Sequence, residues 1–183
     1  TYTDSAAFTC DAAGVITAYT GDRTVKELVV PQIVNGVTVT GIGADVFKDM
    51  AKLEFAAIPD TVTSIGDFAF SGCEKLNTIY PYQPVVDPAT GVDTGKFVIL
   101  NSEQNARGVI TLPTNLNQIG TGAFAGCTSV GKFAVADANA YFTTHAWDRA
   151  WTQQPNDNSG DEVVTNPKNT GEVLLSKDGT IMY

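Results

Sequence analysis

One segment, residues 62–76, recurs almost unchanged at residues 116–130, and this repeat constrains the fold more than any other feature of the chain. A weaker copy covers residues 39–53. Ile42 and Ile65 lie 23 positions apart, a spacing typical of proteins whose units bury their apolar faces only by stacking on one another. The sequence therefore predicts a stack of similar coils.

Each repeat unit has two parts. Alternating apolar residues that end in proline predict a strand with one face turned inward, because proline has no N–H to donate to a neighbouring strand. An Ile-Gly pair then predicts a tight corner, and a phenylalanine follows. We expect the phenylalanines to form a buried row, each worth about 1.5–3 kcal/mol through burial. The equivalent residues are the prolines Pro31, Pro59 and Pro113, and the phenylalanines Phe47, Phe70 and Phe124.

The regular spacing is interrupted once. Ile65 and Ile119 lie 54 positions apart, which is two periods of 23 plus eight. We therefore expect a degenerate third coil between Leu76 and Pro113, with residues 96–100 as its clearest strand. Residues 82–95 are rich in turn-forming residues, which predicts a surface loop, and a binding loop is the alternative.

The combined pattern resembles a known family. Leu-x-x-Ile-x-Ile-Pro-x-x-Val-x-x-Ile-Gly-x-x-Ala-Phe-x-x-Cys is similar to the BspA-type leucine-rich repeat of bacterial surface proteins. Residues 14–19 and 33–39 resemble the opening of such domains, and residues 139–141 with 171–180 resemble their closing hairpin. The resemblance implies a secreted or cell-surface bacterial protein that binds a protein partner of the host or of bacteria. It implies no shared catalytic residues.

We therefore expect a leucine-rich-repeat solenoid of about five coils of period 23. It would be a right-handed β/α superhelix, rich in strands, with short helical or 3-10 turns. Residues 1–183 would form a single domain. Residues 1–24 would be an N-terminal cap and residues 25–136 the repeats, with the insertion at 82–95. Residues 137–183 would be a C-terminal cap, with a second insertion at 145–170.

Composition and motifs exclude several function classes. The net charge is −9, and no basic patch is present to displace counterions from phosphates, so we expect no nucleic-acid partner. No apolar run approaches the roughly 20 residues that span a bilayer, so we expect no membrane insertion of this segment. Nucleotide-binding, zinc-protease and hydrolase motifs are absent, which predicts neither a cofactor nor enzymatic activity.

The three cysteines fit neither a disulfide framework nor a metal site. Cys73 and Cys127 occupy the same repeat position, which Met50 fills in the first copy, so this is a packing position. Two coils between them would separate the sulfurs by roughly 10 Å, whereas a disulfide needs Cα atoms within about 7 Å. The sequence predicts free, buried thiols at both positions. Cys10 is either free or paired outside this chain.

Two chemical sites can be weighed and rejected. A Cys–His hydrolase would need His145, the only histidine, as its base, but no activated-nucleophile motif surrounds Cys10 and the other two cysteines are structural. His145 is better interpreted as a loop or packing residue. Residues 156–162 offer oxygen ligands for calcium, but the EF-hand register places Pro155 where a carboxylate is required. A solvated acidic loop is expected there.

Two tryptophans lie four positions apart and would share one face of a helix. They allow three interpretations: a protein-binding hot spot, a sugar-stacking platform or a cap over the last coil. The leading hypothesis is a non-enzymatic module for protein binding and adhesion, and the alternative is a carbohydrate-binding module. We expect binding on the outward side chains of the strands and on the two insertions. The candidate partner-binding residues are Trp147, Asp148, Arg149 and Trp151.

Overall fold

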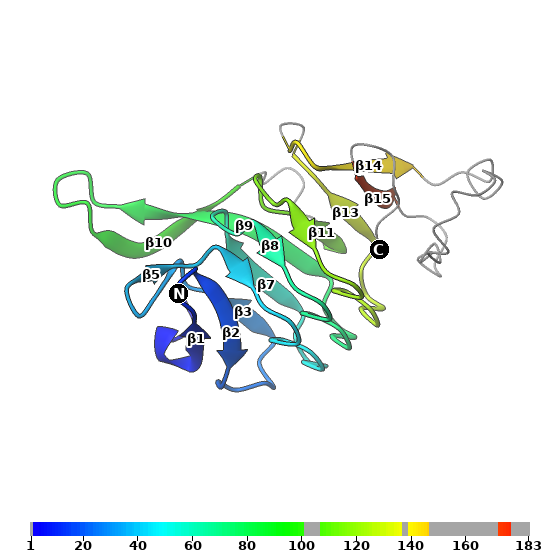
Figure 1. Cartoon of the computed structure of the whole chain (residues 1–183), viewed down its shortest axis with the longest axis horizontal. Helices are drawn as coiled ribbons and strands as arrows, with labels where there is room; N and C mark the ends of the chain where they lie inside the picture. The colour runs from blue at the N-terminus through cyan, green and yellow to red at the C-terminus, as the bar shows by residue number, and fades with distance from the viewer. Residues whose placement is uncertain (1, 101–106, 137–138, 147–171, 177–183) are drawn as a thin grey trace.

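The computed structural model describes residues 2–100, 107–136, 139–146 and 172–176. Two sheets of short strands enclose a common core (Figure 1). Sheet A has the strand order β1-β2-β6-β8-β12, and sheet B has the order β13-β11-β9-β7-β3, with β10 paired to β9. The strands of sheet A are β1 (Phe8–Cys10), β2 (Val15–Tyr19), β6 (Gly41–Ile42), β8 (Ser64–Ile65) and β12 (Gln118–Ile119). Those of sheet B are β3 (Glu27–Val29), β7 (Phe55–Pro59), β9 (Thr78–Val86), β10 (Asp93–Ile99), β11 (Val109–Thr111) and β13 (Lys132–Ala134).

Equivalent residues of successive coils stand next to each other in both sheets. In sheet A, Ile42 pairs with Ile16 on one side and Ile65 on the other, in parallel register. In sheet B, Ala56 pairs with Leu28 and Ile79 in the same way. All of these side chains are buried, so each coil closes the core left open by the one before it. The expected strand-rich architecture is confirmed.

The predicted helical turns are not found in the described residues of the repeats. Among the described residues the one 3-10 helix is η1 (Ser5–Ala7), which precedes the repeats. The corners bend through turns because each holds residues in the left-handed conformation, such as Asp45 (φ 57°), Asp49 (φ 59°) and Phe68 (φ 54°), which interrupt a right-handed helix. No helix in the described ranges is long and apolar enough to cross a bilayer.

Two antiparallel pairs lie outside the main sheets. β4 (Ile33–Val34) pairs with β5 (Val37–Thr38), and β14 (Phe142–Ala146) pairs with β15 (Glu172–Ser176). Asn139 precedes β14 and is buried, with its side-chain amide donating to the carbonyls of Thr114 and Leu116. Its Oδ1 accepts from the backbone N–H groups of Tyr141 and Phe142. This one side chain therefore ties the start of β14 to the last described repeat.

The predicted phenylalanine row is present. The ring centroids of Phe47 and Phe70 are 5.2 Å apart, and those of Phe70 and Phe124 are 5.5 Å apart. Phe47 and Phe70 are fully buried, whereas Phe124 is partly exposed. Tyr19 extends the row at its N-terminal end and Phe133 at the other, with centroid distances of 5.8 Å and 5.5 Å to their neighbours.

The corner glycines act differently from the prediction. A Cβ atom on Gly66 would lie 2.7 Å from the backbone of Gly43 and Ala44, and one on Gly120 would lie 2.3 Å from the nitrogen of Asp67. Neither glycine has a positive φ. Glycine is required here because adjacent coils approach so closely that no side chain fits between them.

The predicted third coil forms in one sheet only. In sheet B, β9 lies between β7 and β11, and Ile79 pairs in parallel with Ala56 and Ile110. Ile119 of β12 pairs directly with Ile65 of β8, so no strand separates them in sheet A. Residues 96–100, expected as the clearest strand of the third coil, fall in and just after β10, which belongs to the arm and runs antiparallel to β9. The extra residues between the two repeats therefore add a strand to sheet B and a two-stranded arm, but no strand to sheet A.

The segment at residues 82–95 was expected to be a loop, and most of it forms strands. β9 and β10 pair from Tyr82–Ile99 at the base to Val86–Asp93 near the tip. Apolar residues lie on both sides of the turn-forming run at residues 87–91, which is the pattern of a hairpin. Figure 1 shows this β9–β10 ribbon projecting away from the body of the molecule, at the end opposite β14 and β15.

Candidate functional site

The candidate residues chosen from the sequence, Trp147, Asp148, Arg149 and Trp151, lie outside the described residues. The insertion at 145–170 is described only at its first two residues, and the acidic run at 156–162 also falls outside. The binding role of these residues therefore stays a prediction. Within the described ranges no group of three or more histidine, cysteine or acidic side chains is placed to hold a metal ion.

The cysteines have structural surroundings. Cys73 and Cys127 are free, as predicted, and Cys73 is completely buried, but Cys127 is only partly buried. These two cysteines lie on adjacent repeats at the corners of the stack, so the predicted separation by two coils is wrong. Each thiol donates to a phenylalanine carbonyl of the preceding coil, Cys73 to Phe47 at 3.1 Å and Cys127 to Phe70 at 3.2 Å. The two thiols thus point along the stack in the same sense.

These thiols are poor nucleophiles. Burial raises the pKa of Cys73 to about 11 and that of Cys127 to about 12, so at neutral pH neither is a thiolate. Burial also raises the pKa of Cys10, with the nearby Asp11 carboxylate adding to the shift. The proposed base of a Cys–His pair, His145, lies in β14, while Cys10 lies in β1 at the edge of sheet A.

The outward face of sheet B was expected to be a binding surface, but much of it is covered. Val29, Ala57 and Tyr82 are buried on this face and form a second apolar cluster. Tyr2 and Phe97 pack over that cluster, Tyr2 from the N-terminal segment and Phe97 from β10. The N-terminal segment is held there because the Thr3 N–H donates to the Val29 carbonyl at 2.9 Å. Several outward strand positions of sheet B are therefore buried.

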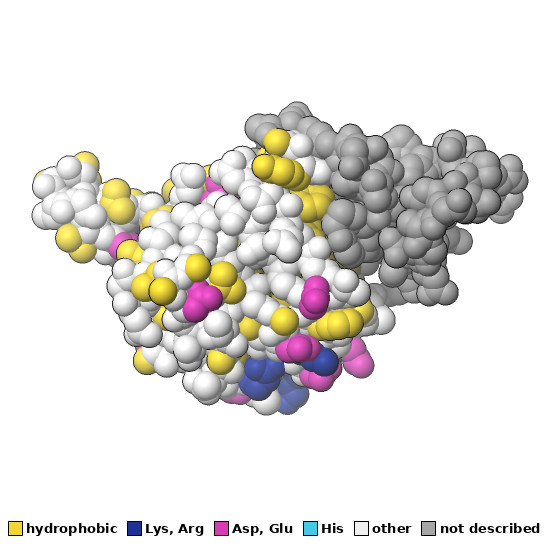
Figure 2. Space-filling model, viewed as in Figure 1, with side chains coloured by type: hydrophobic (Ala, Val, Ile, Leu, Met, Phe, Trp, Pro, Cys, Tyr) yellow, Lys and Arg dark blue, Asp and Glu magenta, His cyan; other side chains and the backbone are white. Residues whose placement is uncertain are grey.

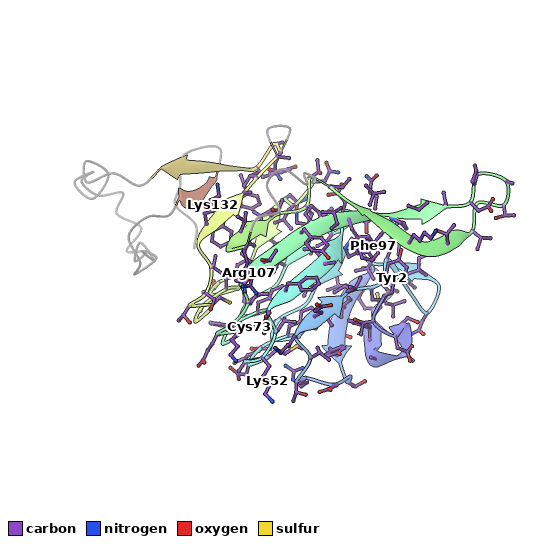
Figure 3. All side chains as sticks on the ribbon, turned by 180° about the vertical axis from the view of Figure 1, so that it is seen from behind. Tyr2, Lys52, Cys73, Phe97, Arg107 and Lys132 are labelled. Carbon is purple, nitrogen blue, oxygen red and sulfur yellow. The ribbon has the colours of Figure 1, made fainter. Side chains whose placement is uncertain are left out.

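Three aromatic rings anchor the β9–β10 ribbon to the body. The Tyr82 and Phe97 centroids are 4.9 Å apart, and Tyr2 lies 5.7 Å from each. Figure 3 shows Tyr2 and Phe97 together where the ribbon meets the body. The Tyr82 hydroxyl donates to the Val30 carbonyl, and burial raises the pKa of this phenol far above its usual value. The base of the ribbon is thus fixed by packing and by a buried hydrogen bond.

Beyond that base the ribbon carries four exposed valines. Its register places Val85 and Val98 on one face, opposite the face that carries Phe97. Val86 and Val92 lie nearer the tip. Four valines thus share one projecting element, and their exposed fractions are 37% for Val85, 51% for Val86, 62% for Val92 and 55% for Val98. Figure 2 shows apolar side chains on this arm, whereas side chains of both charges gather along the lower edge of the body.

The comparison with protein families settles the class of the chain. The family model described as "BspA type Leucine rich repeat region (6 copies)" matches residues 29–87 and 100–150, more than half of the chain. The chain belongs to the BspA-type leucine-rich repeat family. None of the curated proteins compared matches this BspA-type chain.

Several crystal structures are similar to the BspA-type chain. One is a leucine-rich repeat protein of T. pallidum, 22% identical, with 73% of this chain and 71% of that one covered and a TM-score of 0.43. A leucine-rich cell surface protein of Faecalibacterium prausnitzii is 20% identical over 73% of this chain and 41% of its own, with a TM-score of 0.37. A leucine-rich repeat protein of Bacteroides ovatus is 20% identical over 72% of this chain and 40% of its own, with a TM-score of 0.36.

The β9–β10 ribbon was not predicted from the sequence. Its signal was present, because two apolar stretches, residues 82–86 and 96–100, flank the turn-forming run at residues 87–91. The BspA-type repeat pattern directed attention to a coil strand instead. The exposed valines follow only from the register, since the sequence does not reveal which face packs against the body.

Proposed function

We propose that this BspA-type domain is a non-enzymatic, protein-binding module of a secreted or cell-surface bacterial protein, with a role in adhesion. Proteins of the family are typically surface-associated, and leucine-rich-repeat domains generally mediate protein interactions. The observation that carries the proposal is the projecting β9–β10 ribbon with its four exposed valines. We further infer that residues 1–183 are one solenoid domain, closed at both ends by its caps.

The ribbon has the physical properties of a binding element. Val85 and Val98 share one face of the ribbon, and exposed apolar residues gathered on one projecting element indicate a contact surface. Covering about 25–30 Å² of apolar surface contributes nearly 1 kcal/mol, so a partner that covers Val85 and Val98 gains several kcal/mol. The anchored base of the ribbon limits the ordering cost of binding, because the arm already has its bound shape.

The edge of the ribbon adds a second means of recognition. Among the described residues β10 pairs only with β9. The Leu100 N–H donates to the Pro81 carbonyl. Because hydrogen-bonded and non-hydrogen-bonded pairs alternate along an antiparallel ladder, the backbone N–H and C=O groups of Phe97 and Ile99 point away from β9. An extended segment of a partner can add to this edge as a further strand.

A binding screen against extracellular-matrix and bacterial surface proteins tests the proposal, by biolayer interferometry with the immobilised domain. We expect the paired substitution Val85→Ser/Val98→Ser to weaken binding to any partner at least tenfold. Tyr141→Ser is the matched control, since this exposed aromatic lies just before β14, at the end of the molecule opposite the ribbon. Equal binding by the ribbon variant and the wild type would exclude the ribbon as the contact.

The spacing of Trp147 and Trp151 supports a second proposal, binding of a carbohydrate by stacking on their indoles. A glycan array distinguishes this proposal from the first. A Trp147→Ala/Trp151→Ala variant that keeps full binding would exclude the tryptophan platform. Loss of glycan binding with retained protein binding would assign the two activities to different sites.

A further inference from the structure

A groove of about 260 Å³ runs beneath the β9–β10 ribbon, between Asp93 of β10 and the N-terminal segment. Tyr2 and Asp4 line it on one side, and Pro31, Gln32 and Ile33 line it on the other. Pockets that enclose drug-sized ligands have volumes of about 300–1,000 Å³. This groove is smaller, so it is suited to a single side chain of a partner.

The groove carries uncompensated negative charge. Within the part of the chain that the structure describes, neither Asp4 nor Asp93 forms an ion pair, and no lysine or arginine lines the groove. The Asp4 carboxylate accepts from the Ala6 N–H at 3.0 Å. The Asp93 carboxylate accepts from the Gly95 N–H at 2.8 Å and from the Tyr2 hydroxyl at 3.4 Å. These bonds hold both carboxylates in place without neutralising them.

Gln32 supplies an acceptor that lacks a donor. Its Oε1 is buried and has no hydrogen-bond partner, although Gln32 lines the groove. A buried acceptor without a donor is unfavourable, and most such atoms in native proteins have a partner. A ligand that brings an N–H donor to this oxygen would remove the penalty. The unpaired Gln32 Oε1 does not depend on the two carboxylates. Because this oxygen is an acceptor, it indicates that a ligand of the groove supplies a hydrogen-bond donor.

The walls suit the stem of an aliphatic amine. Ile33 is 54% exposed at the rim, and Tyr2 offers an aromatic ring, which attracts an ammonium ion placed over its face. Burial, together with the hydrogen bond to Asp93, raises the pKa of Tyr2 to about 12, so the phenol stays protonated and keeps donating to Asp93.

We propose that this groove binds a primary ammonium group on an aliphatic chain, namely a lysine side chain of the protein partner. The carboxylates of Asp4 and Asp93 match its charge, Gln32 Oε1 accepts one of its three N–H groups, and Tyr2 and Ile33 contact its methylenes. The inference rests on the proposed protein-binding function, because it names the residue with which the partner enters. Val85 and Val98 lie on the ribbon face opposite Phe97, which packs on Tyr2, so they contact a different part of the partner.

An NMR titration with butylammonium chloride tests the site directly. Amide shifts at Thr3, Ile33 and Asp93 should saturate with butylammonium, and n-butanol should bind at least tenfold more weakly because it lacks the charge. We expect Asp4→Asn/Asp93→Asn to abolish the butylammonium shifts and Gln32→Met to weaken binding at least threefold. Asp87→Asn is the matched control, since this carboxylate lies on the ribbon turn outside the groove.

Three results would overturn the proposal. Butanol and butylammonium could bind equally, Asp87→Asn could weaken binding as much as the double variant, or calcium could displace butylammonium and bind more tightly. The amide spectrum of each variant shows whether it is folded. If Asp4→Asn/Asp93→Asn does not fold, Gln32→Met still tests the groove, because it leaves both carboxylates in place. The titration needs no partner, so it remains decisive if the binding screen fails. If a partner binds Asp4→Asn/Asp93→Asn as tightly as the wild type, the lysine assignment is wrong and the proposed function stands.

Discussion

Removing the ring of Phe70 tests whether the aromatic row is a main source of stability. The side chain is fully buried and stacks on Phe47 at 5.2 Å and on Phe124 at 5.5 Å. A buried Phe→Ala substitution costs about 3–5 kcal/mol, and an aromatic pair adds about 0.5–1.5 kcal/mol beyond the area it buries. We therefore expect Phe70→Ala to cost about 4–5 kcal/mol, a large share of the 5–15 kcal/mol typical of native proteins.

Urea unfolding followed by far-ultraviolet circular dichroism measures this loss. With a slope of about 2 kcal/mol per molar urea, the midpoint should fall by about 2 M. Phe124→Ala is the internal comparison, because this ring is partly exposed and should cost roughly half as much. Phe70→Leu keeps most of the volume and should cost less than about 1.5 kcal/mol. If Phe70→Ala cost no more than Phe124→Ala, the ring row would not be the central support of the core.

Three further substitutions or conditions test other parts of the fold. Gly66→Ala should lower the urea midpoint by the equivalent of about 1–3 kcal/mol, because its Cβ would meet the neighbouring coil; an unchanged midpoint would show that the coils can separate. Asn139→Ala should cost about 2–4 kcal/mol in a thermal or urea transition, since two carbonyls and two N–H groups lose their partner; a loss below 1 kcal/mol would refute its role as a tie. The raised pKa values of Cys73 (about 11) and Cys127 (about 12) mean that the native state holds protons that unfolded thiols release from pH 9.0 upward. The free energy of unfolding should therefore be greatest below pH 9.0 and fall as the pH rises toward 11; urea midpoints at pH 8 and pH 10.5 that agree would contradict this.

The acidic groove and the covered face of sheet B depend on contacts between distant residues, so the sequence did not indicate either of them. The hydrogen bond between Tyr2 and Asp93 joins residues 91 positions apart. Neither residue belongs to the repeat pattern, and nothing local to either one indicates the other. The sequence search instead selected the two tryptophans, whose spacing is a local signal.

The amino-acid sequence by itself determined the family, the strand-rich class and the inside of the coil. Ile65, Phe70 and Cys73 could be assigned to the core because their spacing recurs, and a recurring apolar pattern has only one way to be buried when identical units stack. The free state of the thiols followed from the same argument, although the coil separation behind it was wrong.

The tertiary structure alone decided what happens where the pattern breaks. A gap of 54 positions between Ile65 and Ile119 is compatible with a complete coil or with an arm. The strand pairing shows a coil strand in sheet B, an arm, and no strand between β8 and β12 in sheet A. The exposure of the outward strand positions was also undecided in the sequence, since Tyr2 and Phe97 cover them from distant parts of the chain. Local periodicity determines which residues face inward, whereas contacts between distant segments determine which outward surface remains for a partner.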